Sequence, residues 1–145
     1  MKIKSNVEIV HHLNGKIESI SYLDANRKLH NDDGPAYISF SSKGKIISIR
    51  YVVHGLNHRM DGVQFTVFNS EGVKIRKEYW QHGRKHRLDG PALILFNDIG
   101  RAYENAYWVN GLRKFELEMI KEYGLEIVKC KRCNSSFAQS KNQRM

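Results

Sequence analysis

Histidine and aspartate recur at a fixed spacing in this chain, and both residue types serve general acid–base catalysis and metal binding. The stretch HGRKHRLDG occupies residues 82–90, and HGLNHRMDG stands 28 residues earlier, at 54–62. In each stretch a histidine precedes an aspartate by three positions, as His86 precedes Asp89. Such a pair can exchange protons with a substrate if both groups meet in one cleft. The stretch is therefore either a catalytic motif written twice or one structural turn used twice.

A hydrolase would need a nucleophile beside His86 and Asp89. No serine stands at a recurrent or glycine-flanked elbow position. Catalytic sites are also seldom duplicated along an array of repeats. Glu78 and Glu104 are the other isolated acids, and we expect both to be solvated strand residues. We predict no catalytic residues and no enzyme, and we keep a hydrolase that uses His86 and Asp89 as the third alternative.

Metal binding needs ligands that converge on one point. Recurring histidines in neighbouring copies of a meander would lie about 10 Å apart, too far to share one ion. Within one copy, His54 with His58, or His82 with His86, could converge. Cys130 and Cys133 form half of a zinc site, and no second pair is present. We predict a structural role for the histidines, two free thiols, no metal and no cofactor.

Cations and aromatic residues gather in one region of the chain. Aromatic rings among cations hold single-stranded nucleic acid or nucleotides by stacking. The opposing interpretation is an ordinary exposed strand, because Lys and Glu alternate in VKIRKEYW (73–80). The candidate binding residues are His58, Arg59, Arg84, His86, Arg87, Trp80, Trp108, Arg50 and Arg76.

The 145-residue chain carries a formal charge of +9, of which residues 129–145 contribute five. A basic chain attracts nucleic acid, anionic nucleotides or acidic proteins. We expect one domain over residues 1–128 and a basic, flexible tail over 129–145. No apolar run approaches the roughly 20 residues of a membrane span, so we expect no membrane partner. Two neighbouring cysteines suit a reducing, cytoplasmic compartment.

The elements that would position these residues repeat with a period of 28. Recurring residues include Phe40, Phe68 and Phe96; Gly44, Gly72 and Gly100; Tyr51, Tyr79 and Tyr107; and Gly55, Gly83 and Gly111. Each copy contains two short runs rich in aromatic and β-branched residues, which predict strands. The first strand spans 36–40, 64–68 or 92–96, with 7–11 as the equivalent at the start, and the second spans 45–53, 73–81 or 101–109, preceded by 16–23. The connections are too short for parallel pairing. We predict an all-β meander of about eight antiparallel strands.

Two kinds of turn alternate between the strands. The short turn holds Gly44 or its equivalents, which adopt positive φ at low cost. The longer turn contains the H-R-x-D-G motif, where Asp89 can accept backbone hydrogen bonds and Arg87 can pair with that carboxylate or with a neighbouring copy. Pro35 and Pro91 fix φ before the next strand. Each residue type in the motif thus has a structural role.

Alternation along the second strands separates two faces. Tyr51, Tyr79 and Tyr107 point one way with Ile47, Ile75 and Tyr103, whereas Val52, Trp80 and Trp108 point the other way with Arg50, Glu78 and Ala106. Both faces carry large apolar groups. The sheet therefore curls, or the C-terminal segment covers one face, or a partner does.

The pattern changes after Gly111. Leu112, Phe115 and Met119 stand at helical spacing in LRKFELEMIKEYG (112–124), and Gly124 fits a C-cap,. We predict a helix near 113–123 that caps the open end of the sheet, and a last strand over 125–128.

The cadence Y/W-x-x-G…H-R-x-D-G-P-A resembles MORN-like repeats, above all in YWQHGRKHRLDGPALILF (79–96) and YVVHGLNHRMDG (51–62). The resemblance covers roughly residues 7–111. It implies β-hairpins stacked into an elongated sheet and a role in binding or scaffolding. The 28-residue period and the H-R-x-D-G element depart from ordinary MORN units. The small size and the Lys/Asn/Ile-rich composition also resemble a phage or large-virus accessory protein.

These observations favour a non-enzymatic binding protein that engages a protein partner through one sheet face or through the H-R-x-D-G turn row. For a viral source, the expected partner is a host factor in the host cytoplasm. The alternative is binding of nucleic acid or a nucleotide by the basic turns and aromatic strands.

Overall fold

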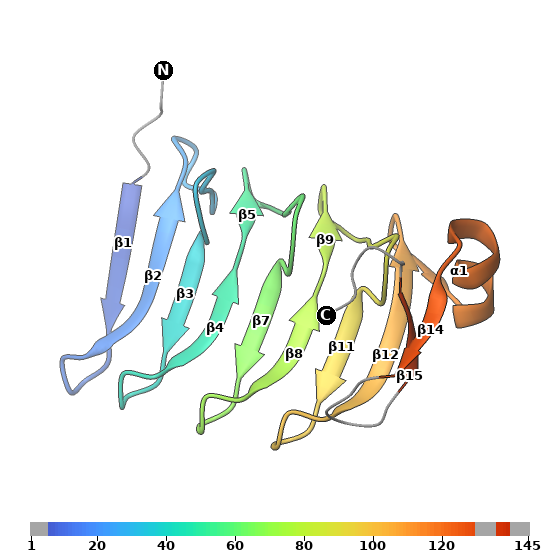
Figure 1. Cartoon of the computed structure of the whole chain (residues 1–145). Coiled ribbons are helices and arrows are strands. Elements are labelled where there is room, and N and C mark those ends of the chain that lie inside the picture. The colour runs from blue at the N-terminus through green and yellow to red at the C-terminus, as the bar shows by residue number, and fades with distance from the viewer. Residues whose placement is uncertain (1–5, 130–135, 140–145) are drawn as a thin grey trace.

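The computed structural model describes residues 6–129 and 136–139. Their main feature is one twisted, single-layer antiparallel sheet whose strands lie side by side in chain order (Figure 1). The main sheet has nine strands in the order β1-β2-β3-β4-β7-β8-β11-β12-β13. The predicted all-β antiparallel meander with one helix near the C-terminal end is confirmed. No helix among the described residues is long and apolar enough to cross a membrane.

The elements are β1 (Asn6–His11), β2 (Ile17–Leu23), β3 (Tyr37–Phe40), β4 (Ile46–Arg50), β5 (Val52–Val53), β6 (Leu56–Asn57), β7 (Phe65–Phe68), β8 (Lys74–Glu78), β9 (Trp80–Gln81), β10 (Arg84–Lys85), β11 (Leu93–Phe96), β12 (Ala102–Val109), β13 (Leu112–Lys114), α1 (Glu116–Tyr123), β14 (Glu126–Lys129) and β15 (Ser136–Gln139).

The long second strands are shorter than predicted, because the chain leaves the main sheet at a tyrosine. The N–H of Tyr51 still donates to the carbonyl of Gln64, but Val52 and Val53 pair with β6 in a separate two-stranded ribbon. The equivalent break falls at Tyr79, before β9 pairs with β10. Each predicted strand over 45–53 or 73–81 is therefore two strands in the structure.

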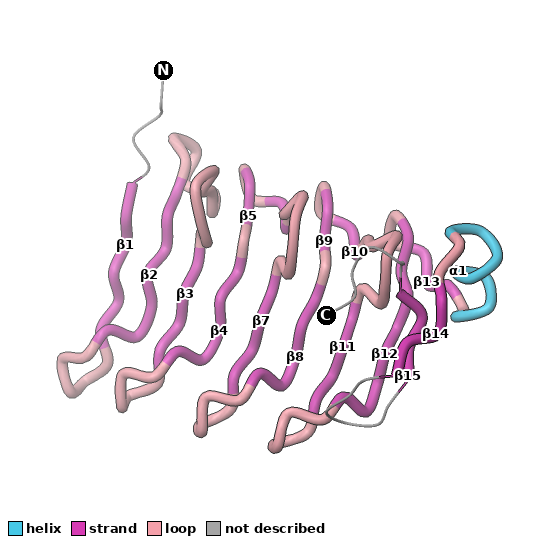
Figure 2. The backbone as a smooth tube through the Cα atoms, in the orientation of Figure 1, coloured by secondary structure: helices cyan, strands magenta, loops and turns pink. Residues whose placement is uncertain are grey.

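Turns of two kinds join the strands, one kind at each end of the strands (Figure 2). The short turns hold Gly44, Gly72 and Gly100 at φ values of 87°, 82° and 80°. In each of them the glycine N–H donates to the carbonyl three residues before it, as that of Gly44 does to Ser41. The positive φ predicted for these glycines is confirmed.

The ribbon turns need two consecutive residues in the left-handed region. His54 and Gly55 have φ values of 45° and 79°, and His82 and Gly83 follow with 50° and 76°. Positive φ at both central residues defines the tight hairpin turn that suits twisted strands. The recurrence of Gly55 and Gly83 was visible in the sequence, whereas the positive φ of the histidine before each glycine was not predicted.

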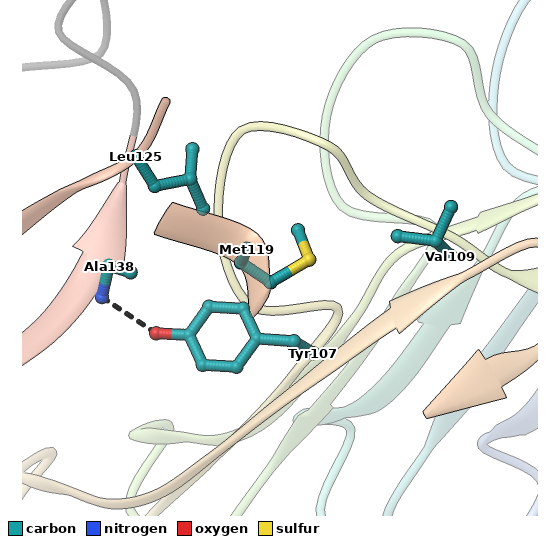
Figure 3. Packing of buried hydrophobic residues seen from close by; sticks show 5 residues of the cluster. All are labelled: Tyr107, Val109, Met119, Leu125 and Ala138. Atoms are coloured by element: carbon teal, nitrogen blue, oxygen red, sulfur yellow. Dashed lines mark hydrogen bonds between the residues drawn. The ribbon is translucent and has the colours of Figure 1, made fainter. Parts of the chain in front are cut away.

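The C-terminal cap supplies a buried apolar cluster. Tyr107 and Val109 of β12 pack against Met119 of α1, with Leu125 and Ala138 beside them (Figure 3). The backbone N–H of Ala138 donates to the hydroxyl oxygen of Tyr107 at 2.6 Å. The predicted cap at this end of the sheet is present.

The cap differs from the prediction in two details. Leu112 lies in β13 and Phe115 is the exposed N-cap, so the helix begins at Glu116, where the Glu118 carboxylate accepts the N–H of Phe115. Residues 136–139 form β15, which pairs with β14, and so depart from the expected tail without fixed structure. The helix ends at Gly124, whose φ of 64° confirms the predicted C-cap. Cys130 and Cys133 lie outside the described residues.

A candidate binding face of the sheet

Cross-strand register defines the two faces of the sheet. We call face A the side that carries the row Arg50, Phe65, Glu78, Leu93 and Ala106, whose members pair across successive strands. We call face B the side that carries the row Ile20, Ile38, Ile49, Thr66, Lys77, Ile94 and Asn105. Side chains alternate between faces along a strand, so each of these rows lies on one side.

The candidate binding residues divide between these faces. Trp80 lies with Glu78 on face A, because its indole N–H donates to that carboxylate at 2.6 Å. The ammonium of Lys85 lies near both tryptophans. Its Nζ is 5.5 Å from the Trp80 ring centroid and 5.0 Å from that of Trp108. Residues of the H-R-x-D-G turns lie by contrast next to Tyr51 and Tyr79. The structure therefore does not unite all nine residues in one site.

Glu78 is buried, which corrects the expectation of a solvated strand residue. Arg76 forms an ion pair with its carboxylate from the same face, and Trp80 donates the second hydrogen bond. A buried carboxylate is tolerated when it has such partners. Arg50 on face A stacks over the Phe65 ring, with its guanidinium carbon 4.5 Å from the centroid. The exposed Arg84 packs its side-chain stem beside Gly111.

The H-R-x-D-G turn is held by its arginine. The Arg87 guanidinium lies 3.9 Å from the Tyr79 ring centroid, pairs with Asp89 at 2.8 Å and donates to the Pro91 carbonyl at 3.1 Å. Arg59 repeats two of these contacts, over the Tyr51 ring at 3.9 Å and to the Val63 carbonyl at 2.8 Å. The predicted arginine–aspartate pair is confirmed at Arg87.

The motif histidine has a second structural role. The Nδ1 atom of His86 accepts the backbone N–H of Asn110 at 3.0 Å, and that of His58 accepts the N–H of His82 at 2.9 Å. Burial, with His82 nearby as a smaller cause, lowers the pKa of both His58 and His86 below the ordinary 6.5. Among residues 6–129 and 136–139, no group of three or more His, Cys, Asp or Glu side chains is placed to hold a metal ion.

Two depressions lie between successive turns and are built from equivalent positions. One, of about 520 Å³, is lined by Tyr51, His58 and Arg59 together with the turn at 31–34. The other, of about 410 Å³, is lined by Tyr79, His86 and Arg87 together with the turn at 59–62. Each offers an aromatic ring, an imidazole and a guanidinium to a small or extended ligand.

An apolar band lies on face B. Binding through one sheet face was predicted, but the residues of this band were absent from the candidate binding residues, although the 28-residue recurrence of its phenylalanines was visible in the sequence. We define the band as Ile38, Phe40, Ile47, Ile49, Phe68, Ile75, Ile94 and Phe96. Ile47 is 40% exposed, and the others are half-buried. An apolar face of this length on a single-layer sheet is typical of an interaction surface.

Lys77 is the charged residue within the band. Its Nζ lies 5.4 Å from the Phe96 ring centroid. Burial lowers the pKa of Lys77 below its usual 10.5, and the charges of Lys74 and Arg87 add to this effect. The apolar band therefore contains a partly buried cation whose nearby charged groups are also cations. Such a position favours an anionic group on a partner.

Comparison with protein-family models, with curated proteins and with solved structures found no match to this chain.

Proposed function

We propose that this protein is a non-enzymatic binding protein, built from MORN-like β-hairpin repeats, that engages a protein partner through face B. The observation that supports this most is the apolar band, which stays half-exposed along the middle of the main sheet. Antiparallel sheets that face water on one side normally carry polar residues there. An apolar water-facing side is stabilised when a partner covers it.

The partner that best fits this face has an apolar centre and acidic groups around it. Lys77 lies within the band. The short turns that border it carry more exposed cations (Lys43, Lys45, Lys74 and Arg101) than exposed carboxylates (Glu71 and Asp98). An excess of one charge at the rim of an apolar patch steers a partner of the opposite sign. The net charge of +9 acts in the same direction.

The engagement of His86 and Asp89 supports a role without catalysis. The Nδ1 atom of His86 accepts the backbone N–H of Asn110, and Asp89 pairs with Arg87. A general base must be able to reach the proton that it abstracts. Groups committed to the turn itself favour an architectural role.

The test is affinity purification from nuclease-treated host extract with matched variants. The double variant Ile47→Glu, Phe68→Glu places two charges on the band. The control variant Val67→Glu changes the residue next to Phe68 and places one charge on face A. We expect a protein that the wild type and Val67→Glu recover and that the double variant loses, with circular dichroism unchanged in all three. Identical recovery by the wild type and the double variant would contradict binding through face B.

The two depressions favour a second candidate function, the binding of nucleic acid or a nucleotide. Ring stacking on Tyr51 and Tyr79 beside guanidinium groups suits bases and phosphates,. Binding of an oligonucleotide should then weaken steeply with salt. It should also weaken in Arg59→Ala, while Lys43→Ala at a short turn serves as the control. Affinity that does not change between low and high salt would remove this candidate.

A further inference from the structure

The two ends of the main sheet differ in how they are closed. Beyond β12 and β13 lie α1, β14 and β15 with their buried cluster, whereas β1 is the first strand in the order. All six residues of β1 are exposed, and no strand among residues 6–129 and 136–139 pairs with its outer side. Natural proteins usually protect such an edge, because its free N–H and C=O groups template pairing with another chain.

The register identifies the backbone groups that this edge offers. The N–H of Tyr22 donates to the Ala36 carbonyl, so Tyr22 faces β3 and away from β1. Val7 stands opposite Tyr22, and Ile9 stands opposite Ile20. Along an antiparallel pair of strands, opposite residues alternate between two arrangements. In one, the two residues exchange backbone hydrogen bonds; in the next, the N–H and C=O groups of both residues point away from the partner strand. Val7, Ile9 and His11 therefore direct their N–H and C=O groups away from the sheet.

Devices that usually prevent edge pairing are missing from β1. The strand, NVEIVH, contains no lysine and no proline. The irregularity near its end inserts Glu18 into β2 and leaves β1 itself regular. The charge of Glu8 is balanced by an ion pair with Arg27. A regular, exposed edge of this kind is ready for pairing.

We propose that the outer edge of β1 binds β1 of a second copy of this chain, antiparallel and about a two-fold axis through Ile9. Pairing Ile9 with Ile9 places Val7 opposite His11 and Glu8 opposite Val10 of the other copy. This register joins residues 7–11 of both strands and forms roughly six backbone hydrogen bonds, two for each outward-facing pair. Moving the axis to Glu8 keeps as many residues paired but sets two carboxylates opposite each other, which is destabilising.

Charge supports the association of identical edges. Residues 6–29, which form the first hairpin and the turn after it, hold three acidic and three basic side chains: Glu8, Glu18, Asp24, Lys16, Arg27 and Lys28. Lys2 and Lys4 precede this region in the sequence, and residues 30–145 carry most of the net charge of +9. Two copies that meet at β1 therefore bring together the parts of the chain with low net charge and keep the more basic parts apart.

The two-fold axis would be perpendicular to the sheet, so face B of both copies lies on the same side. The apolar band of each copy then continues toward that of the other, which enlarges the apolar surface available to a large partner. The dimer does not depend on the partner proposed above, and it is tested with purified protein alone.

Sedimentation velocity measures the association. Because a dimer population depends on protomer concentration, the mass is followed from about 1 to about 100 µM. We expect it to rise from the 16.9 kDa of one chain toward twice that value. Ile9→Pro removes one outward N–H that β1–β2 pairing does not use, and should keep the protein monomeric, whereas Ile9→Thr retains that N–H and should still dimerise.

A second pair of variants tests the register and needs no proline. Val10→Lys sets an ammonium opposite Glu8 of the other copy and should tighten the dimer, whereas Val10→Glu sets like charges opposite each other and should weaken it, with about a tenfold difference in Kd between the two. A wild type that stays monomeric at all these concentrations, or a folded Ile9→Pro variant that dimerises like the wild type, overturns the proposal. Equal dimerisation of Val10→Lys and Val10→Glu overturns the register.

Discussion

The imidazole of His58 accepts the backbone N–H of His82 on its Nδ1 atom, at 2.9 Å. The same bond joins His30 to His54 at 3.1 Å and His86 to Asn110 at 3.0 Å. Each donor has a positive φ, between 45° and 50°, and precedes a glycine. The histidine of one turn therefore stabilises the strained turn tip of the next, and its Nδ1 must stay unprotonated to do so.

Acid should weaken this ladder. Burial lowers the pKa of His58 and His86 below 6.5, so the unfolded chain binds protons at a pH where the folded chain does not. Stability from these histidines is complete above pH 6.5 and is lost as pH falls through their folded pKa values,. We expect the melting temperature to fall over that range, by about 2–4 °C for each kcal/mol lost.

The matched control for acid sensitivity is the double variant His58→Asn, His86→Asn. The asparagine Oδ1 can take the place of Nδ1 as acceptor and does not titrate. Its melting temperature should change less than that of the wild type between pH 7.5 and pH 5.5. An equal decrease in both proteins would assign the acid sensitivity to other groups.

Arg27 has a φ of 59°, at the turn position that glycine occupies in the short turns. A left-handed conformation costs a non-glycine residue about 1–2 kcal/mol. Arg27→Gly should therefore stabilise the fold by about 1 kcal/mol, less the contribution of the exposed ion pair with Glu8,. Arg27→Ala loses the same ion pair and keeps the strain, so denaturant unfolding should rank glycine above alanine. The reverse order would show that this turn does not store strain.

Gly90 and Gly34 occupy the same motif position and should respond differently to alanine. A Cβ atom at Gly90 would lie 2.8 Å from Cζ of Arg87, whereas one at Gly34 would lie 3.5 Å from Nδ2 of Asn31. Arg87 can yield only by loosening its contacts with Asp89 and Pro91. We expect Gly90→Ala to cost about 1–3 kcal/mol and Gly34→Ala to be nearly neutral, as measured by chemical denaturation. Equal effects would contradict this role of Arg87.

The recurrence of residues every 28 positions was enough to predict the strands, the short turns and the meander. It did not predict the strand break at Tyr51 or Tyr79, because that break depends on hydrogen bonds to residues a whole turn away, such as Gln64. The burial of Glu78 was also missed. An alternating Lys–Glu pattern gives no indication that Arg76 and Trp80 will both meet one carboxylate.

The candidate site was predictable only in part, for a similar reason. The motif arginines and histidines were singled out, but their partners depend on how one turn stacks on the next. Phe40, Phe68 and Phe96 were noticed as a recurrence and interpreted as strand residues. Whether such residues line a core or an open face depends on the number of layers in the sheet, which the strand pattern alone does not determine.

Tyr107 should connect the C-terminal cap to the sheet. Its buried hydroxyl accepts the N–H of Ala138 at 2.6 Å, and burial raises its pKa to about 12. Tyr107→Phe leaves that N–H without its acceptor and should cost about 1–3 kcal/mol, with faster hydrogen exchange at Ala138. Because the folded pKa exceeds the unfolded value of 10.0, this tyrosine's contribution is complete below pH 10 and is lost as pH rises toward 12,.

The control for this prediction lies on the same strand. Tyr103 is 67% exposed, so Tyr103→Phe should leave the stability at neutral pH unchanged. Tyr107→Phe should be less stable at pH 7 and lose less stability than the wild type between pH 10 and pH 12. If both variants matched the wild type, the cap would be held by the apolar packing of Met119 and Leu125 without help from the hydroxyl.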